Sequence, residues 1–458
     1  MEYRLEHDLL GSKEVPESAY WGIHTQRALE NFKVSSCKVS FELIRAIAAV
    51  KKAACLVNGE LNYLSREKFD AILRACEEVM DGKFSDQFPL DALQGGAGTS
   101  THMAVNEVIA NRASEILGGA KGDPAAVHPI EEVNLHQSTN DVYPTALKIA
   151  AIFALRRLSE AVSGLQGAFQ EKEKEFTGIV KIGRTELVEA VPMTLGAEFG
   201  GFAEAIGRDR WRTFKCEERL RVVNLGGTAI GTGLGAPRRY IFLVAEKLRD
   251  VSGLGLSRAE NLPGDTAHAD PFVEVSGILK AHACNLVKIA NDLRLSSLLG
   301  EIRLPELQAG SSIMPGKINP VIPEAVIQAG LKVMANDFLV TEAAGRGTFQ
   351  INEFMPLLAH ALLESLEILI RVNEVFSGHV RGITADFKRC EEISSGSRSL
   401  VTAFLPELGY EEAGALLKEF DAAGGKDLRK FLEGKMGRSR VEKVFSPQNL
   451  NALGYRDE

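Results

Sequence analysis

The feature that most constrains the fold of this chain is a series of long apolar stripes with helical spacing. The longest stripe steps by three or four residues over about six helical turns. Its members are Leu147, Ala151, Leu155, Leu158, Val162, Leu165 and Phe169. Residues with this spacing lie on one face of an α-helix, whereas the side chains of a strand repeat every two residues. The pattern therefore predicts a long helix from Asp141 onward with one broad apolar face.

Four further stripes have the same spacing. They begin near Leu195, Val275, Pro320 and Leu358, and the chain has almost no strand-like alternation. We therefore predict an all-α fold with a central bundle of five long helices. The apolar faces of these helices are broader than the short loops of one subunit can cover. This predicts packing against further copies of the chain.

The sequence on either side of the bundle indicates two further domains. With 458 residues, the chain is long enough for about three domains. Residues 1–35 are rich in turn-forming residues and are predicted to be irregular, and helices are expected from about Ser40 and Arg66. After Ile383 the sequence becomes polar and Gly-rich, with shorter helical pieces. We expect an N-terminal, mainly helical domain over residues 1–138, the bundle over 139–385 and a small C-terminal helical domain over 386–458.

Composition and charge argue against several classes of protein. Hydrophobic residues form 45% of the chain, which argues against disorder. A formal net charge of −8 argues against a nucleic-acid partner, because binding to phosphates needs a basic surface. No apolar run reaches the roughly eighteen residues of a membrane span, and the polar N-terminal segment is unlike a secretory signal. The cysteines are scattered, and neither a Cys-x-x-Cys pair nor a His-Glu-x-x-His motif offers a metal site. This pattern predicts reduced thiols in the cytoplasm.

The candidate site begins with the segment Gly310–Glu324, which runs into the fourth of the long helices. Gly310 and Gly316 give this segment a permissive backbone. Its polar side chains are Ser311, Ser312, Lys317 and Asn319. We predict a mobile, hydroxyl-rich loop that leads into a helix N-terminus, where free N–H groups favour an anion. A plain surface loop can have the same composition, so the ordered Ser-Ser, Lys and Asn carry this prediction.

Two more polar loops lead into predicted helices. Residues 95–101 lack the Lys of a phosphate loop, but they place Thr99 near a helix N-terminus. Residues 137–145 begin Gln-Ser-Thr-Asn and carry Ser138, Thr139 and Asn140. These three side chains suit an N-cap on structural grounds alone. Residues 224–237 form a last Gly-rich loop, whose formal match to a dinucleotide fingerprint follows no convincing strand and is rejected.

Taken in order, these segments resemble the conserved segments of the aspartase/fumarase superfamily. The Ser311 loop is similar to the signature loop of that superfamily, and the loops at Thr99 and Ser138 are similar to its first two segments. Residues 183–196, which begin Gly-Arg-Thr and contain Val-Pro-Met-Thr, are similar to the third. The N-terminal arm and the stretch Asn-Pro-Val-Ile-Pro-Glu are closest to those of aspartate ammonia-lyases. The similarity runs nearly from end to end.

The resemblance implies a lyase that reversibly eliminates ammonia from L-aspartate to give fumarate, with no cofactor or metal. Ser311 would be the catalytic base that removes a proton beside a carboxylate, through an aci-carboxylate intermediate. The substrate-binding residues would be Thr185, Ser312, Lys317 and Asn319 for the α-carboxylate, and Thr99, Ser138, Thr139 and Asn140 for the β-carboxylate and the amine. The resemblance also implies a homotetramer with active sites shared among subunits.

Glu186 departs from the pattern of the superfamily, whose members usually carry His or Gln at this pocket position. His and Gln can donate a hydrogen bond, whereas an ionised Glu only accepts one. Three arrangements are open: Glu186 turns toward a cation such as Arg184, is protonated, or faces the ammonium group of the substrate. We expect the last, which favours an amino over a hydroxyl leaving group. A second departure is the stretch 294–302, which is shorter than is usual in the superfamily.

Two other functions stay open. A related lyase acting on another succinyl compound, such as a class II fumarate hydratase, would use similar loops, although the Asn-Pro-Thr-Gln-Cys-Glu of fumarases is absent here. A catalytically silent scaffold of the same fold would be expected to lose the Ser-Ser and Lys-x-Asn residues, which are intact. The nine histidines, His102 and His136 among them, are expected to be structural or surface residues.

Overall fold

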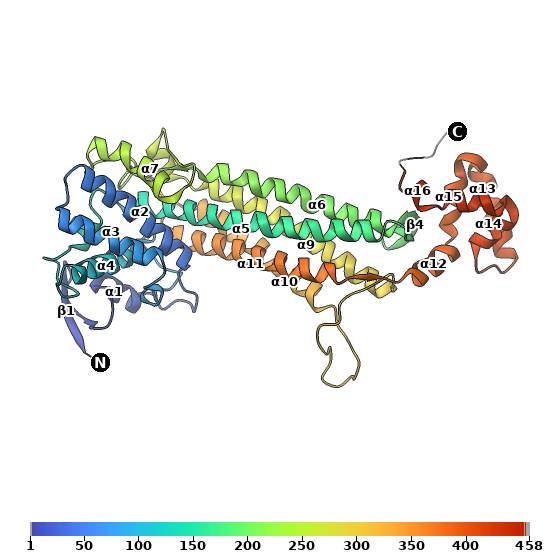
Figure 1. The fold of residues 1–458 in the computed structure, drawn as a ribbon, viewed down its shortest axis with the longest axis horizontal. Coiled ribbons are helices and arrows are strands. Elements are labelled where there is room, and N and C mark those ends of the chain that lie inside the picture. Colours follow the sequence, from blue (N-terminus) through green and yellow to red (C-terminus); the bar gives the residue numbers. More distant parts are fainter. Residues whose placement is uncertain (1, 453, 455–458) are drawn as a thin grey trace. The chain divides into compact units, whose positions relative to one another are not determined.

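The computed structural model describes residues 2–452 and 454, and it is mainly helical (Figure 1). Its five long helices coincide with the five apolar stripes, which confirms the all-α prediction. They are α5 (Thr139–Glu175), α6 (Leu195–Cys216), α9 (Asp270–Leu299), α10 (Val321–Ala344) and α11 (Met355–Arg381). None of the described helices is long and apolar enough to cross a membrane.

The remaining elements are shorter. The helices before the bundle or between its members are α1 (Ile23–Asn31), α2 (Phe41–Glu60), α3 (Arg66–Met80), α4 (Thr99–Ile116), α7 (Arg238–Ser252) and α8 (Leu262–Ala267). The helices that follow it are α12 (Phe387–Gly396), α13 (Leu405–Ala422), α14 (Leu428–Met436), α15 (Arg438–Val444) and α16 (Pro447–Leu450). The strands pair in twos: β1 (Tyr3–Asp8) with β2 (Gly11–Pro16), β3 (Val180–Thr185) with β4 (Val188–Thr194), β5 (Val222–Val223) with β6 (Ser257–Arg258), and β7 (Ile302–Arg303) with β8 (Thr384–Ala385).

The N-terminal segment is more regular than the sequence predicted. Residues 1–35 were expected to be irregular, but the antiparallel β1–β2 hairpin and α1 occupy much of this range. Arg4 of β1 holds the segment together because its guanidinium donates to the carbonyls of Pro16, Ala19 and Trp21 at 2.9, 2.9 and 2.6 Å. The prediction was wrong because β1 is short and its pattern is inverted: the charged side chains of Arg4, Glu6 and Asp8 are half-buried, whereas Tyr3 and Leu5 are exposed.

The chain divides into two compact units, and each is described by itself. The first unit contains the residues up to Leu158, Arg212–Lys280 and Lys332–Ile368. The second contains Ser159–Trp211, Ala281–Leu331 and the residues from Leu369 onward. Each of the five long helices contributes residues to both units. The division of the sequence at residues 138 and 385 stays a prediction.

In the first unit, α2 packs against α3, α4 and α7. Its apolar stripe is buried, and alanines beside it, Ala46, Ala49 and Ala53, are buried as well and allow neighbouring helices to approach closely. The members of that stripe are Leu43, Ile47, Val50 and Ala54. One charged residue, Lys51, is buried on the same helix with only 1% of its surface exposed. A buried ammonium requires hydrogen-bond acceptors around it.

In the second unit, a cluster of phenyl rings joins three of the long helices. Phe169 of α5 lies 6.2 Å from Phe199 and 5.7 Å from Phe202, both of α6, measured between ring centroids. It also lies 5.9 Å from Phe376 of α11 in an edge-to-face arrangement. Such pairs add stabilisation to the burial of the rings. A separate apolar cluster joins β3 to the last helices through Ile182, Leu400, Phe404, Phe420, Leu428, Leu432, Val441 and Phe445.

Phe169→Ala should strongly destabilise the second unit. Phe169 is fully buried, and truncating a buried Phe lowers the free energy of unfolding by about 3–5 kcal/mol. Phe387→Ala is a matched control, because Phe387 is 58% exposed at the start of α12. Urea denaturation of both variants measures the difference, and equal losses of stability would contradict the assignment of the phenyl cluster to the core.

Candidate active site

The helix α4 begins at Thr99, directly after the first Gly-rich loop. Gly98 has a φ of 93°, and a Cβ at this position would lie 2.4 Å from a ring carbon of Tyr143. Glycine is therefore required here, both for the left-handed backbone and for the close approach. Thr99 is half-buried, and its hydroxyl donates to the carbonyl of Gly96 at 2.8 Å. These contacts fix Thr99 at a helix N-terminus, beside backbone N–H groups without intrahelical partners.

The helix α5 begins at Thr139, so the second polar loop forms its N-terminus as the sequence predicted. The Ser138 hydroxyl accepts from the N–H of Asn140 at 3.3 Å. The side-chain amide of Asn140 donates to the carbonyl of Ala229 at 2.7 Å. Ala97 and Asn140 line the same small cavity. The starts of α4 and α5 therefore lie together, and with them Thr99 and the Ser-Thr-Asn residues.

Asp141 anchors this loop to the Gly-rich loop at residues 224–237. Its buried carboxylate accepts from the N–H groups of Ser138, Gly226 and Thr228 at 2.9, 3.0 and 3.1 Å. Burial raises the pKa of Asp141 to about 6, and the three N–H groups oppose that rise. Sequence reasoning missed this role. The only signal was an acidic residue directly after Ser-Thr-Asn at a helix start.

Lys51 and His102 also contact this site, and sequence reasoning missed both. His102 Nδ1 lies 2.9 Å from the hydroxyl oxygen of Thr139. Its other ring nitrogen, Nε2, is hydrogen-bonded to Lys51 Nζ. His102 is buried, as expected of a structural histidine, but its hydrogen-bond partner Thr139 is a predicted substrate-binding residue. No local pattern signals this arrangement, because the three residues come from three different helices.

Thr185 and Glu186 lie at the tip of the β3–β4 hairpin. Thr185 pairs with Val188, so Glu186 and Leu187 form a two-residue turn, with φ angles of 53° and 66°. Positive φ at both positions defines a type I′ turn, which matches the twist of the flanking strands. Both predicted site residues are exposed. The hairpin therefore presents them to solvent in this unit.

The base of the hairpin is held by a buried carboxylate. Glu301 has no exposed surface, and it binds Arg184 at 2.7 Å and Lys181 at 3.0 Å. Arg184, one of the partners considered for Glu186, is therefore engaged by Glu301. Within the described part of the chain, Glu186 has no hydrogen bond or ion pair. Glu186 lines a pocket of about 900 Å³ together with Lys181, Arg184 and Lys288.

The signature loop connects β7 to α10 and is seen as a long excursion in Figure 1. Its ends are joined, because Gly310 N–H donates to the carbonyl of Lys317 at 2.7 Å and the Asn319 amide donates to the carbonyl of Gly310 at 2.8 Å. Ser312 and Lys317 are exposed, and Ser311 is half-buried.

Ser311 occupies a turn in which its own hydroxyl oxygen is the acceptor. The backbone N–H groups of Ile313 and Met314 donate to Ser311 Oγ at 3.2 and 2.9 Å. Two such donors favour negative charge on the oxygen that they contact. Gly316, with a φ of 81°, completes the turn in a conformation that suits glycine.

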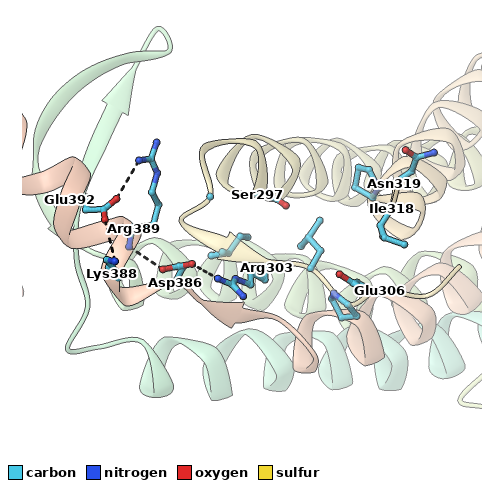
Figure 2. Close-up of a pocket in the computed structure, with 14 residues that line it drawn as sticks. Ser297, Arg303, Glu306, Ile318, Asn319, Asp386, Lys388, Arg389 and Glu392 are labelled. Carbon is cyan, nitrogen blue, oxygen red and sulfur yellow. Dashed lines mark hydrogen bonds and ion pairs between the residues drawn. The ribbon is translucent and has the colours of Figure 1, made fainter. Parts of the chain in front are cut away.

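A pocket of about 560 Å³ lies at the base of this loop (Figure 2). Figure 2 shows Asn319 and Ile318 at one end and a group of ion-paired side chains at the other. Within that group, Arg303 binds Asp386 at 2.6 Å, and Arg389 lies 3.6 Å from Glu392. Because these cations already have carboxylate partners, the pocket offers little free positive charge to a dicarboxylate.

The predicted site residues thus fall into two groups. Thr99 and the Ser138–Asn140 segment belong to the first unit, whereas Thr185, Glu186 and the 310–319 loop belong to the second. Within the first group the structure brings the residues together. In the second group they lie on a hairpin tip and on a loop. Among the described residues, no cluster of three His, Cys, Asp or Glu side chains could hold a metal ion.

Comparisons with known proteins agree in pointing to one family. The family model described as Lyase matches residues 11–335. Aspartate ammonia-lyase from Escherichia coli strain K12 is 43% identical over 464 residues, covering 99% of this chain and 97% of its own length. Aspartate ammonia-lyase from Bacillus sp. is 41% identical over 461 residues, with 99% and 98% covered. The crystal structure of fumarate lyase:delta crystallin from Brucella melitensis bound to cobalt has a TM-score of 0.94 at 43% identity, covering 99% of this chain and 100% of that one.

Asp141→Asn should change how stability depends on pH. The pKa of Asp141 is about 6 in the folded protein against a usual value of 3.8, so the folded state binds this proton more tightly. Its contribution to stability is present below pH 3.8 and is lost as pH rises through 6. Relative to the variant, the wild type should lose about 3 kcal/mol of unfolding free energy across this range. Urea denaturation at several pH values measures the difference, and a difference independent of pH would contradict the assignment.

Proposed function

This chain belongs to the lyase family, within the aspartase/fumarase superfamily, and on that premise we propose that it is a carbon–nitrogen lyase that converts L-aspartate reversibly to fumarate and ammonia. The proposal is supported by relatives named aspartate ammonia-lyases that align over nearly the whole chain. It is also supported by the presence, in this chain, of every hydroxyl, Lys and Asn that the resemblance requires.

The observation that carries the proposal is the environment of the Ser311 hydroxyl. Removing a proton from the carbon beside a carboxylate requires a strong base, and a serine hydroxyl in water is a weak one. The N–H groups of Ile313 and Met314 donate to Ser311 Oγ, and such bonds stabilise the alkoxide form. We assign Ser311 as the base that removes this proton.

The proton leaves the CH₂ group beside the β-carboxylate, so negative charge develops on that carboxylate. Preorganised donors at the place where charge develops supply most of the rate enhancement in such reactions. In our proposal the β-carboxylate and the amine are held by Thr99, Ser138, Thr139 and Asn140. The α-carboxylate is held by Thr185, Ser312, Lys317 and Asn319.

Closure of the signature loop would bring Ser311 to the substrate. The loop is exposed between Ser312 and Ile318 and is pinned at its base by the bonds between Gly310, Lys317 and Asn319. A pinned base with an exposed tip suits motion of the tip as a unit. The apolar side chain of Ile313, 84% exposed in this state, would become covered on closure.

We propose that the chain acts as a homotetramer whose active sites combine residues from several copies. Exposed apolar side chains on the long helices support packing against other copies, because monomeric proteins seldom expose such stripes. They include Phe214, Leu298, Leu331, Phe338 and Val375. A cytoplasmic location and the three-domain division of the sequence belong to the same proposal.

We propose that the Glu186 carboxylate binds the ammonium group of the substrate. This carboxylate is exposed at the hairpin tip, and Arg184 is held away from it by Glu301. It is therefore available to accept a hydrogen bond from an ammonium group. A fumarate hydratase, the alternative function, would gain nothing from a carboxylate beside a hydroxyl leaving group.

The direct test of function is to supply L-aspartate and follow the absorbance of fumarate, with malate and other amino-succinates in parallel. Formation of fumarate from aspartate is expected. If malate alone reacts, the chain is a hydratase. If no succinyl compound reacts in either direction, the silent scaffold is the better description.

Ser311→Ala should lower turnover steeply without affecting the fold. The variant removes one half-buried loop hydroxyl, so stability should barely change. Loss of a general base lowers kcat by about 100- to 10,000-fold. Ser252→Ala, which removes a hydroxyl at the end of α7, is the control and should keep full activity. Near-normal kcat in Ser311→Ala would show that another group is the base.

Glu186→Gln should weaken the preference for aspartate over malate. A hydrogen bond between a carboxylate and an ammonium changes affinity by about tenfold or more. The ratio of kcat/KM values for the two substrates measures the preference. Glu204→Gln, an exposed change on α6, should leave the ratio unchanged. An unchanged ratio in Glu186→Gln would mean that Glu186 has a structural role.

A further inference from the structure

Three polar side chains form a buried chain that ends at Thr139. Lys51 comes from α2, His102 from the first turn of α4 and Thr139 from the start of α5. Lys51 and His102 are each 1% exposed. Lys51 Nζ is hydrogen-bonded to His102 Nε2, and His102 Nδ1 lies 2.9 Å from Thr139 Oγ1. One end of this chain is therefore the buried amino group of Lys51, and the other is a predicted substrate hydroxyl.

The surroundings of Lys51 supply an acceptor for each hydrogen of an ammonium group. Besides His102, Lys51 Nζ contacts Asn134 Oδ1 at 2.8 Å and Gln137 Oε1 at 2.9 Å. Both amides are oriented by their own NH₂ groups, since Asn134 donates to the carbonyl of Gln137 and Gln137 donates to that of Val133. Their oxygens therefore face Lys51. Three acceptors match the three N–H groups of an ammonium.

An ammonium group at Lys51 would fix the tautomer of His102. Burial, followed by the nearby charge of Lys51, lowers the pKa of His102 well below its usual value, so the ring is neutral. A neutral imidazole carries one N–H, and its other nitrogen is an acceptor. When Lys51 is an ammonium, Nε2 accepts from it, so the hydrogen resides on Nδ1 and is donated to Thr139 Oγ1. The Thr139 oxygen is then an acceptor, and its own hydrogen has no partner among the described residues.

We propose that Lys51 and His102 are positioning residues that orient the hydroxyl of Thr139, so that its hydrogen is free to be donated to the substrate carboxylate. The inference rests on the proposed function, in which Thr139 holds the β-carboxylate. That carboxylate gains charge as the proton leaves, so a donor already aimed at it stabilises the transition state. Thr139 alone would be free to turn its hydrogen toward a protein acceptor.

In the opposite arrangement, Lys51 is a neutral amine and Thr139 donates its hydrogen to His102 instead of to the substrate. Burial lowers the pKa of Lys51 well below its usual value, and Asp141 opposes that shift. The other titratable groups that act on the pair are Cys76 and His24. A neutral Lys51 amine would accept from Nε2–H, and Thr139 would then donate to Nδ1. The non-hydrogen atoms would keep the same positions, but the Thr139 hydroxyl would have no hydrogen left to donate to the substrate.

Neutron diffraction from deuterated crystals of the full chain distinguishes the two arrangements without any substitution. We expect deuterium on His102 Nδ1, none on Nε2, three deuterons on Lys51 Nζ and a Thr139 deuteron directed away from His102. Deuterium on Nε2, or a Thr139 deuteron directed at His102, would overturn the proposal. This result does not depend on whether the protein acts on aspartate.

A double-mutant cycle then measures whether Lys51 acts through Thr139. Lys51→Met and Thr139→Val should each lower kcat/KM for aspartate by about tenfold or more. The double variant should lose little more than Thr139→Val alone, because the hydroxyl that Lys51 orients is already gone. In a Thr139→Ser background, which keeps the hydroxyl, Lys51→Met should retain its full effect.

Lys52→Met is the matched control, since Lys52 is the next residue of α2 and binds Glu77 on the surface. It should keep normal kcat/KM. If the losses of Lys51→Met and Thr139→Val multiply, Lys51 acts by another route and the proposal fails. If Lys51→Met does not fold, the neutron result decides. If the wild type forms no fumarate, the proposed function fails, and the neutron result still tests the orientation of Thr139.

Discussion

A buried carboxylate that accepts several backbone N–H groups is the interaction on which the candidate site depends. Asp141 accepts three such groups from two loops. Glu107 of α4 does the same for the N-terminal arm, accepting from the N–H groups of Gly22, His24 and Thr25. Gly-rich and polar loops carry backbone donors that water cannot reach once they are packed, and an unpaired donor is costly. Each carboxylate accepts from several N–H groups at once and thereby holds an irregular segment in one conformation.

At Ser311, backbone N–H groups also donate to a side-chain oxygen, but in a different setting. There the acceptor is a hydroxyl oxygen, and two N–H groups of an exposed loop point at it. Around Asp141 the donors pair with a carboxylate that is fully buried, which makes the support rigid. In the proposed mechanism, the donors around Ser311 favour a charge that need exist only during the reaction. A rigid support for substrate donors and a movable loop for the base are complementary parts of the proposed mechanism.

Much of the fold could be predicted from the sequence, because each long helix carries its own periodic apolar stripe. The site loops were also identifiable, since hydroxyls and glycines precede helix starts. The β3–β4 hairpin was missed because its type I′ turn is Glu186-Leu187 rather than the usual Asn-Gly. Lys51 and His102 were missed for another reason. Their contact joins residues that are distant in sequence, and no local pattern reports such a pairing.

We propose that the loops at Ser311 and at Asn140 serve one substrate and come from different copies of the chain. Subunit complementation tests it most directly. Ser311→Ala and Asn140→Ala, each of low activity, are dissociated, mixed and reassembled, and mixed oligomers are verified by native mass spectrometry. The mixture should regain activity well above the mean of its two parents, because some sites then combine both intact loops. Activity equal to that mean, in verified mixed oligomers, would contradict it.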